Sequence, residues 1–115
     1  MEQQRDNQRI QPFVTACRYR VAGQRIPGFL TNLSRGGARI HSDVEGPIPG
    51  ASIVVEVRMG RQATHAHLPA IVRWGQPSSR GGFVFGVSFD GIGPEEQKVL
   101  DGVIEEFRRR AAQLA

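Results

Sequence analysis

The sequence has little of what a disulfide-rich, zinc-binding or membrane-spanning protein needs. Its 115 residues include one cysteine, Cys17, which can form no intramolecular disulfide and has no second thiol with which to hold zinc. No apolar run approaches the roughly 18 residues that cross a bilayer, and residues 1–9 are too polar for the apolar region of a signal peptide. We therefore expect one globular domain in the cytoplasm, with Cys17 as a small buried core residue.

Recognisable catalytic motifs are missing as well. The sequence has no Gly-x-Ser-x-Gly elbow, no Gly-x-x-x-x-Gly-Lys loop and no His-Glu-x-x-His helix. His65 and His67 lie two apart on an expected strand and could face one metal ion, but they lack a convincing third ligand, and solvated strand-edge histidines are the favoured explanation. We therefore expect neither enzymatic activity nor a metal or other cofactor.

Lysine is almost absent, and the positive charge is unevenly distributed. Lys98 is the only lysine beside 14 arginines, and the N-terminal third (residues 1–39) has a net charge of +5, against −1 for the rest of the chain. Arginine supplies planar bidentate contacts to phosphate and to guanine edges. The distribution indicates an anionic ligand near the N-terminal third, although an ordinary solvated surface is also compatible with it.

The middle of the chain alternates apolar and polar residues with a period of two, the pattern of half-buried strands. Turns are expected at 22–24 and at 34–37, where Gly36 and Gly37 allow a positive φ in a tight connection. In several segments the alternation predicts an inward face, and one such face joins Val72 to Trp74. The expected strands span residues 13–21, 29–33, 38–41, 53–59, 68–74 and 83–89.

After Gly93 the period changes to about 3.6, which predicts one amphipathic helix over about 94–112. Pro94 suits the first helical turn, and acidic residues follow it at the positive end of the helix dipole. Six strands followed by one helix predict a mainly β fold, a six-stranded antiparallel barrel with the C-terminal helix covering an opening or a face.

Two short patterns occur in the basic third. Arg5 and Arg9 form an RxxxR pattern in a polar arm, and Asn32 to Gly37 reads NxSxxG at a strand turn. Together with the strand and helix order, they resemble the PilZ family, small bacterial barrels that bind the second messenger cyclic di-GMP. The resemblance spans nearly the whole chain and extends to Pro49-Gly50 before a valine-rich strand, to Val72-Arg73-Trp74 and to the segment 86–89.

The resemblance implies a receptor in two parts, an arm over residues 1–11 and a barrel domain over 12–115. Its ligand-binding residues would be Arg5, Arg9, Asn32, Ser34, Gly36 and Gly37. The chemistry suits them, because guanidinium groups contact phosphate or stack on purines, amide and hydroxyl groups contact guanine edges, and glycines let backbone N–H groups approach an anion. A purely structural turn remains the alternative for residues 32–37.

Three functions stay open on the sequence alone. The leading one is a cyclic di-GMP receptor that orders its arm on binding and signals through an unidentified effector protein in motility, adhesion or polysaccharide secretion, as in biofilms. The others are a PilZ-like adaptor without nucleotide binding and a basic barrel that binds nucleic acid, which has few outward aromatic side chains for stacking. Asn32 replaces the frequent aspartate, and Gln4 stands where a third arginine would precede Arg5, so the number of bound ligands is also open.

Overall fold

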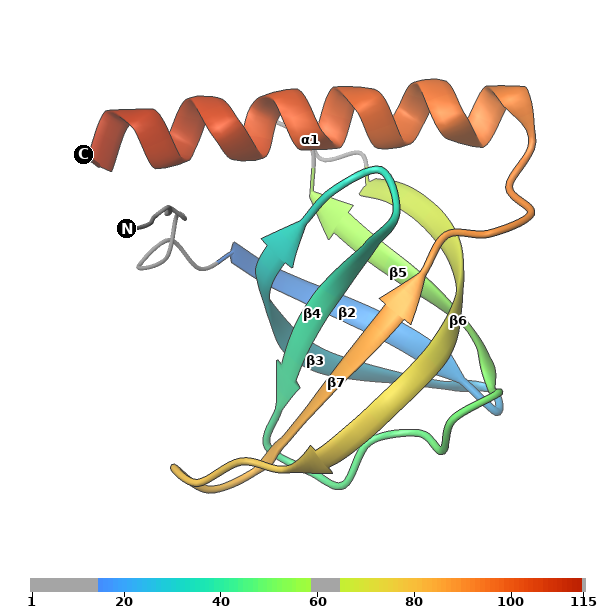
Figure 1. Cartoon of the computed structure of the whole chain (residues 1–115), viewed down its shortest axis with the longest axis vertical. Coiled ribbons are helices and arrows are strands. Elements are labelled where there is room, and N and C mark those ends of the chain that lie inside the picture. The colour runs from blue at the N-terminus through green and yellow to red at the C-terminus, as the bar shows by residue number, and fades with distance from the viewer. Residues whose placement is uncertain (1–14, 59–64, 115) are drawn as a thin grey trace, which may run out of the picture.

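The computed structural model describes residues 15–58 and 65–114, so the RxxxR arm with Arg5 and Arg9 lies outside the described residues (Figure 1). Within the described ranges, six strands precede one helix, labelled as in Figure 1. They are β2 (Thr15–Val21), β3 (Gln24–Leu33), β4 (Gly37–Ser42), β5 (Ser52–Arg58), β6 (His65–Pro77), β7 (Phe83–Ser88) and α1 (Pro94–Leu114).

The six strands form a closed barrel in the order β2-β3-β4-β7-β6-β5, and every neighbouring pair is antiparallel. This confirms the predicted mainly β fold with a six-stranded antiparallel barrel and a C-terminal helix. Closure leaves no unpaired sheet edge among these strands. Among the same residues, no helix has both the length and the hydropathy of a membrane span.

The strand expected at 29–33 begins five residues earlier, at Gln24, and this corrects its predicted start. Val21 pairs with Gln24, and the two residues between them, Ala22 and Gly23, have φ of 53° and 80°. Two positive φ values are typical of the tight hairpin turn that matches the twist of its strands. The predicted turn is therefore real, but it ends at Gly23.

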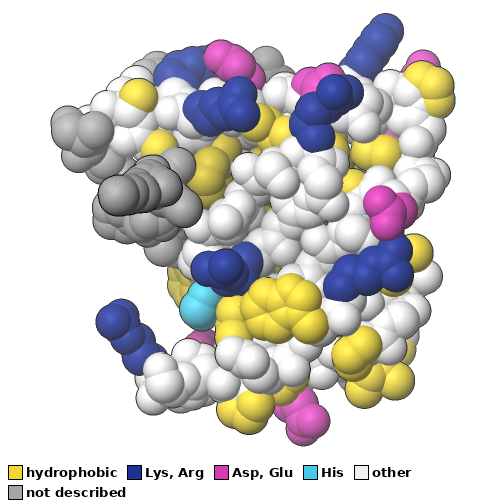
Figure 2. Space-filling model, viewed as in Figure 1, with side chains coloured by type: hydrophobic (Ala, Val, Ile, Leu, Met, Phe, Trp, Pro, Cys, Tyr) yellow, Lys and Arg dark blue, Asp and Glu magenta, His cyan; other side chains and the backbone are white. Residues whose placement is uncertain are grey.

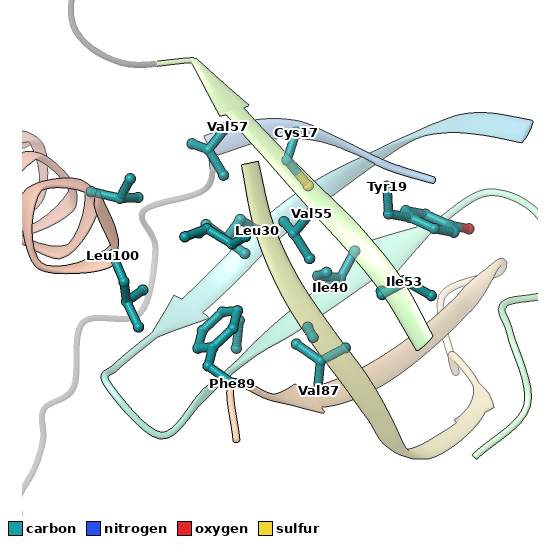
Figure 3. Packing of buried hydrophobic residues seen from close by; sticks show 14 of the residues in the cluster. Cys17, Tyr19, Leu30, Ile40, Ile53, Val55, Val57, Val87, Phe89 and Leu100 are labelled. Atoms are coloured by element: carbon teal, nitrogen blue, oxygen red, sulfur yellow. The ribbon is translucent and has the colours of Figure 1, made fainter. Parts of the chain in front are cut away.

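The barrel interior is filled by alternate side chains of all six strands. Tyr19, Leu30, Ile40, Val55 and Phe85 are fully buried, and Figure 3 shows the first four pointing into a shared core. The Tyr19 ring meets that of Phe85 edge to face, with centroids 5.0 Å apart. Cys17 is buried too, as expected, and burial raises the pKa of its thiol to about 12.

Helix α1 lies across one end of the barrel (Figure 1), and its apolar side chains complete the core. Its observed span agrees with the predicted 94–112 to within two residues at the C-terminal end. At its start, the Gly93 N–H donates to Glu96 Oε1 at 2.8 Å, the reciprocal half of a capping box. The buried side chains on its inner face are Leu100, Val103, Ile104 and Phe107.

One predicted inward face is wrong at its last residue. Val72 is fully buried, but Trp74 is 41% exposed, because the pairing of β6 with β7 shifts register between these two residues. A bulge of this kind places one extra residue in a strand and re-aims the side chains that follow it. Trp74 therefore lies on the outside of the barrel.

Candidate functional site

The turn of the NxSxxG pattern is held by backbone hydrogen bonds. The Ser34 N–H donates to the Gly37 carbonyl oxygen at 2.9 Å, and the Ser34 hydroxyl donates to the same oxygen at 3.4 Å. The Phe89 N–H donates to the Gly36 carbonyl oxygen at 3.3 Å, which fastens the turn to the end of β7. Ser34 thus has a structural part, but its exposed hydroxyl, held only by a long hydrogen bond, keeps acceptor sites facing solvent.

The two glycines of the turn have different reasons to be glycine, and neither has the positive φ that the sequence suggested. A Cβ on Gly37 would collide with the carbonyl oxygen of Val87, because β4 and β7 approach closely there. Among the residues that the structure describes, a Cβ on Gly36 would meet only the Ser34 Oγ, at 3.9 Å. Gly37 is therefore required by packing within the barrel, whereas the space above Gly36 is open to a ligand.

Asn32 lies beside the turn with an unengaged amide. Its side chain is exposed and has no hydrogen-bond partner among residues 15–58 and 65–114, and its backbone pairs with Arg39 of β4. The register shift between Leu30 and Asn32 marks a bulge just before it. The amide is thus available to donate and accept outward, as guanine recognition requires.

The pairing of the strands places Asn32 in a row of cross-strand partners that spans four strands. Asn32 of β3 pairs with Arg39 of β4, Arg39 pairs with Gly86 of β7, and Gly86 pairs with Trp74 of β6. We call these four residues the front wall. Figure 2 shows hydrophobic side chains between Lys and Arg side chains on the face formed by β4 and β7, the strands nearest the viewer in Figure 1.

The indole of Trp74 lies directly against Gly86, which has no side chain to keep it away. A Cβ on Gly86 would collide with the indole ring of Trp74. Trp74 is still 41% exposed in this packing, and the exposed Arg39 is the cross-strand partner of Gly86 on the other side. Sequence reasoning missed Trp74 and Arg39. A glycine inside a strand, a usual mark of close approach, was the available signal.

Ion pairs fix both edges of this surface. Arg73, next to Trp74, donates from Nε to Ser88 Oγ and from an Nη to Asp90, both at 2.7 Å. In the turn, Arg35 Nε donates to Asp101 of α1 at 3.1 Å. The turn is thereby tied to the helix that covers the barrel end.

His41 follows on β4, two residues beyond Arg39. Burial, with a smaller contribution from the positive charge of Arg39, lowers the pKa of its imidazole below the ordinary value of 6.5. The neutral ring is therefore favoured in the folded barrel. Among the described residues, no three His, Cys, Asp or Glu side chains gather in a way that could hold a metal ion.

The sequence itself decides the family. It matches the PilZ domain over residues 3–106, a segment that contains both Arg5 and Arg9 and the whole 32–37 turn. The chain belongs to the PilZ domain family. No curated protein matches this PilZ chain.

Two solved structures share the fold of this PilZ chain at low sequence identity. One is the PilZ domain with c-di-GMP of YcgR from Escherichia coli, with a TM-score of 0.65 and 19% identity over 87% of this chain and 86% of that one. Another is the inhibitor of motility MotI (DgrA) from Bacillus subtilis, with a TM-score of 0.63 and 17% identity over 88% of this chain. This chain spans only 48% of the MotI chain.

Proposed function

We propose that this PilZ domain is a non-enzymatic receptor for cyclic di-GMP, bound over the front wall and the 34–37 turn. The observation that carries the proposal is the row of cross-strand partners in which the exposed residues Asn32, Arg39 and Trp74 occupy neighbouring strands, with only Gly86 between Arg39 and Trp74. A hydrogen-bonding amide, a cation and an aromatic plane are the groups that a ligand with two guanines and two phosphates needs. The E. coli relative of this fold carries cyclic di-GMP.

Each group has a task in this arrangement. Asn32 contacts a guanine edge, and the open backbone at Gly36 approaches the anion. The Ser34 hydroxyl accepts from a base, or exchanges its 3.4 Å hydrogen bond to the Gly37 carbonyl oxygen for one to a phosphate. Arg39 neutralises phosphate and Trp74 stacks on a purine, an interaction worth about 1–3 kcal/mol per base in other nucleotide-binding proteins. Gly37 acts indirectly, since it allows β4 to pack against β7.

Arg5 and Arg9 complete the site from the arm. Their guanidinium groups reach phosphate oxygens or the O6 and N7 atoms of guanine when segment 5–9 settles over the ligand. Fixing the backbone opposes binding by about 1–2 kcal/mol per residue, so only a few residues need to order. Hydrogen exchange tests this step: the amides of 1–11 should gain protection with cyclic di-GMP, and equal protection in both states would refute arm ordering.

A partner protein recognises the ligand-bound form of the domain. The Arg35–Asp101 ion pair links the ligand-contacting turn to α1, so a ligand that moves the turn also acts on the helix. The similarity in fold to an inhibitor of motility makes motility the first process to examine. Action through a partner in the cytoplasm stays a prediction, as does the number of ligands bound.

Calorimetric titration of variants with cyclic di-GMP tests the site. Arg5→Ala and Arg9→Ala should each weaken binding by about 1.5–3 kcal/mol, the range for hydrogen bonds to charged groups. Asn32→Ala should weaken it by about 0.5–1.5 kcal/mol, the range for a hydrogen bond between neutral groups. Arg108→Ala on the exposed face of α1 is the matched control and should bind as the wild type. Thermal melts of the unliganded variants must accompany the titrations, because an unfolded Asn32→Ala barrel would favour a purely structural turn.

A further inference from the structure

A group of basic side chains lies on the other side of the barrel. Strands β2 and β5 are neighbours in the closed order and lie opposite β4 and β7. On the outer face of these two strands and of the adjoining β3 and β6, four arginines and one histidine surround a single carboxylate. We call this set the basic wall: Arg18, Arg20, Arg25, Arg58 and His67 around Glu56.

Glu56 is the buried carboxylate at the centre of the basic wall. Its side chain is only 2% exposed, and its two carboxylate oxygens contact Arg20 Nε at 2.8 Å and Arg25 Nε at 3.1 Å. His67 Nε2 lies 4.0 Å from the same carboxylate. One negative charge thus faces two guanidinium groups, whose side chains are still 44% and 51% exposed. The pair is held in place and retains a net positive charge toward solvent, a preorganised anion contact.

An open hollow of about 550 Å³ adjoins Arg20 of this pair. Arg20 forms one side of it, and its apolar surface comes from Val54, Pro69, Ile71 and Ile92. Asp90 and Glu96 line it as well. Volume and apolar lining both suit the insertion of a side chain or a small group.

We propose that the basic wall and the hollow together bind an acidic segment of a partner protein, with one apolar side chain in the hollow and carboxylates on Arg20 and Arg25. The inference rests on the proposed receptor function, which requires a surface for the effector, and it assigns that surface to a wall distinct from the ligand site. Charge complementarity selects the partner, because the exposed guanidinium groups match carboxylates bidentately.

A nucleic acid fits this surface less well. A phosphate backbone repeats its negative charge at every nucleotide and would meet Asp90 and Glu96 at the hollow. A peptide places carboxylates only over the arginines and an uncharged side chain in the hollow. The aromatic surface offered by Trp74, which base stacking would use, belongs to the front wall.

Selection from a displayed library of random 12-residue peptides on the full-length protein tests the proposal, with binding of each recovered peptide measured by fluorescence anisotropy. The peptides should carry Asp or Glu beside an apolar residue. The matched variants are Ser52→Glu and Ser52→Lys, since Ser52 is exposed, lines the hollow and makes no contact with Glu56. Ser52→Glu should weaken binding about tenfold through like-charge repulsion, whereas Ser52→Lys should not.

Recovered peptides without acidic residues, or equal binding by the two Ser52 variants, would overturn the proposal. A 12-nucleotide single-stranded DNA that displaces the labelled peptide as effectively as unlabelled peptide does would also overturn it. Both variants should bind cyclic di-GMP as the wild type does. If the wild type and both variants all fail to bind cyclic di-GMP while the acidic peptides still bind Ser52→Glu more weakly than Ser52→Lys, the receptor function is refuted and the docking surface is supported.

Discussion

The adjacent glycines of the 34–37 turn allow the packing and the binding roles of this loop to be separated. Replacing Gly37 by alanine drives a methyl group into the Val87 carbonyl oxygen, a backbone atom that moves only if β4 and β7 separate. Overpacking of this kind typically costs about 1–3 kcal/mol of unfolding free energy. Replacing Gly36 by alanine adds a methyl group into open space at a residue without positive φ. That change should leave stability unchanged or raise it by about 0.4–1 kcal/mol, because alanine restricts the unfolded chain.

Cyclic di-GMP binding should respond in a different order from stability. The methyl group of Gly36→Ala separates the backbone from the anion, and the loss of one charge-assisted hydrogen bond corresponds to about a tenfold or greater rise in Kd. Urea unfolding gives the stability of each variant, and calorimetric titration under conditions in which the variant is folded gives its affinity for cyclic di-GMP. Unchanged affinity in Gly36→Ala would refute ligand approach at that backbone, and wild-type stability in Gly37→Ala would refute the packing argument.

Three further predictions concern the barrel itself. Cys17 should react with a thiol reagent at pH 8 only as fast as the protein unfolds, because its thiol is buried and its pKa is raised to about 12; rapid labelling of native protein would contradict this. Tyr19→Phe, which removes a buried 2.8 Å hydrogen bond to Ser42 Oγ, should lower the unfolding free energy by about 1–2 kcal/mol, and adding Ser42→Ala should recover part of the loss in urea titrations. The folded-state pKa of His41 is lowered by burial and by Arg39, so the unfolded chain binds the extra proton; stability should fall as pH drops below 6.5, and His41→Gln should flatten that slope.

Local periodicity was enough to predict most of this fold. The alternating apolar residues of two expected strands lie in the core, and the change of period after Gly93 locates the helix to within two residues. These core residues are Ile53, Val55, Val57, Phe85, Val87 and Phe89. The sequence failed where pairing between strands overrides alternation. The bulge after Val72 turns Trp74 outward, and the hairpin at Ala22 and Gly23 extends β3 back to Gln24, because in both places the partner strand fixes the backbone.

The candidate site divides in the same way. The contiguous NxSxxG motif was enough to predict Asn32 and Ser34 as site residues, and both are exposed, one beside the turn and one in it. The motif could not indicate Arg39 or Trp74, since only register across β4, β7 and β6 places them beside Asn32. The roles of Arg5 and Arg9 stay predictions, because the arm lies outside the described residues.

Titration of the full-length wild-type protein with cyclic di-GMP at 0.15 M salt tests the central claim most directly, with GTP and a short single-stranded oligonucleotide as competitors. The account predicts saturable binding of cyclic di-GMP that neither competitor displaces at equal concentration, and an affinity that weakens with added salt because part of it comes from exposed arginines. No heat of binding, or equal displacement by GTP or the oligonucleotide, would contradict the assignment of the front wall as a cyclic di-GMP site.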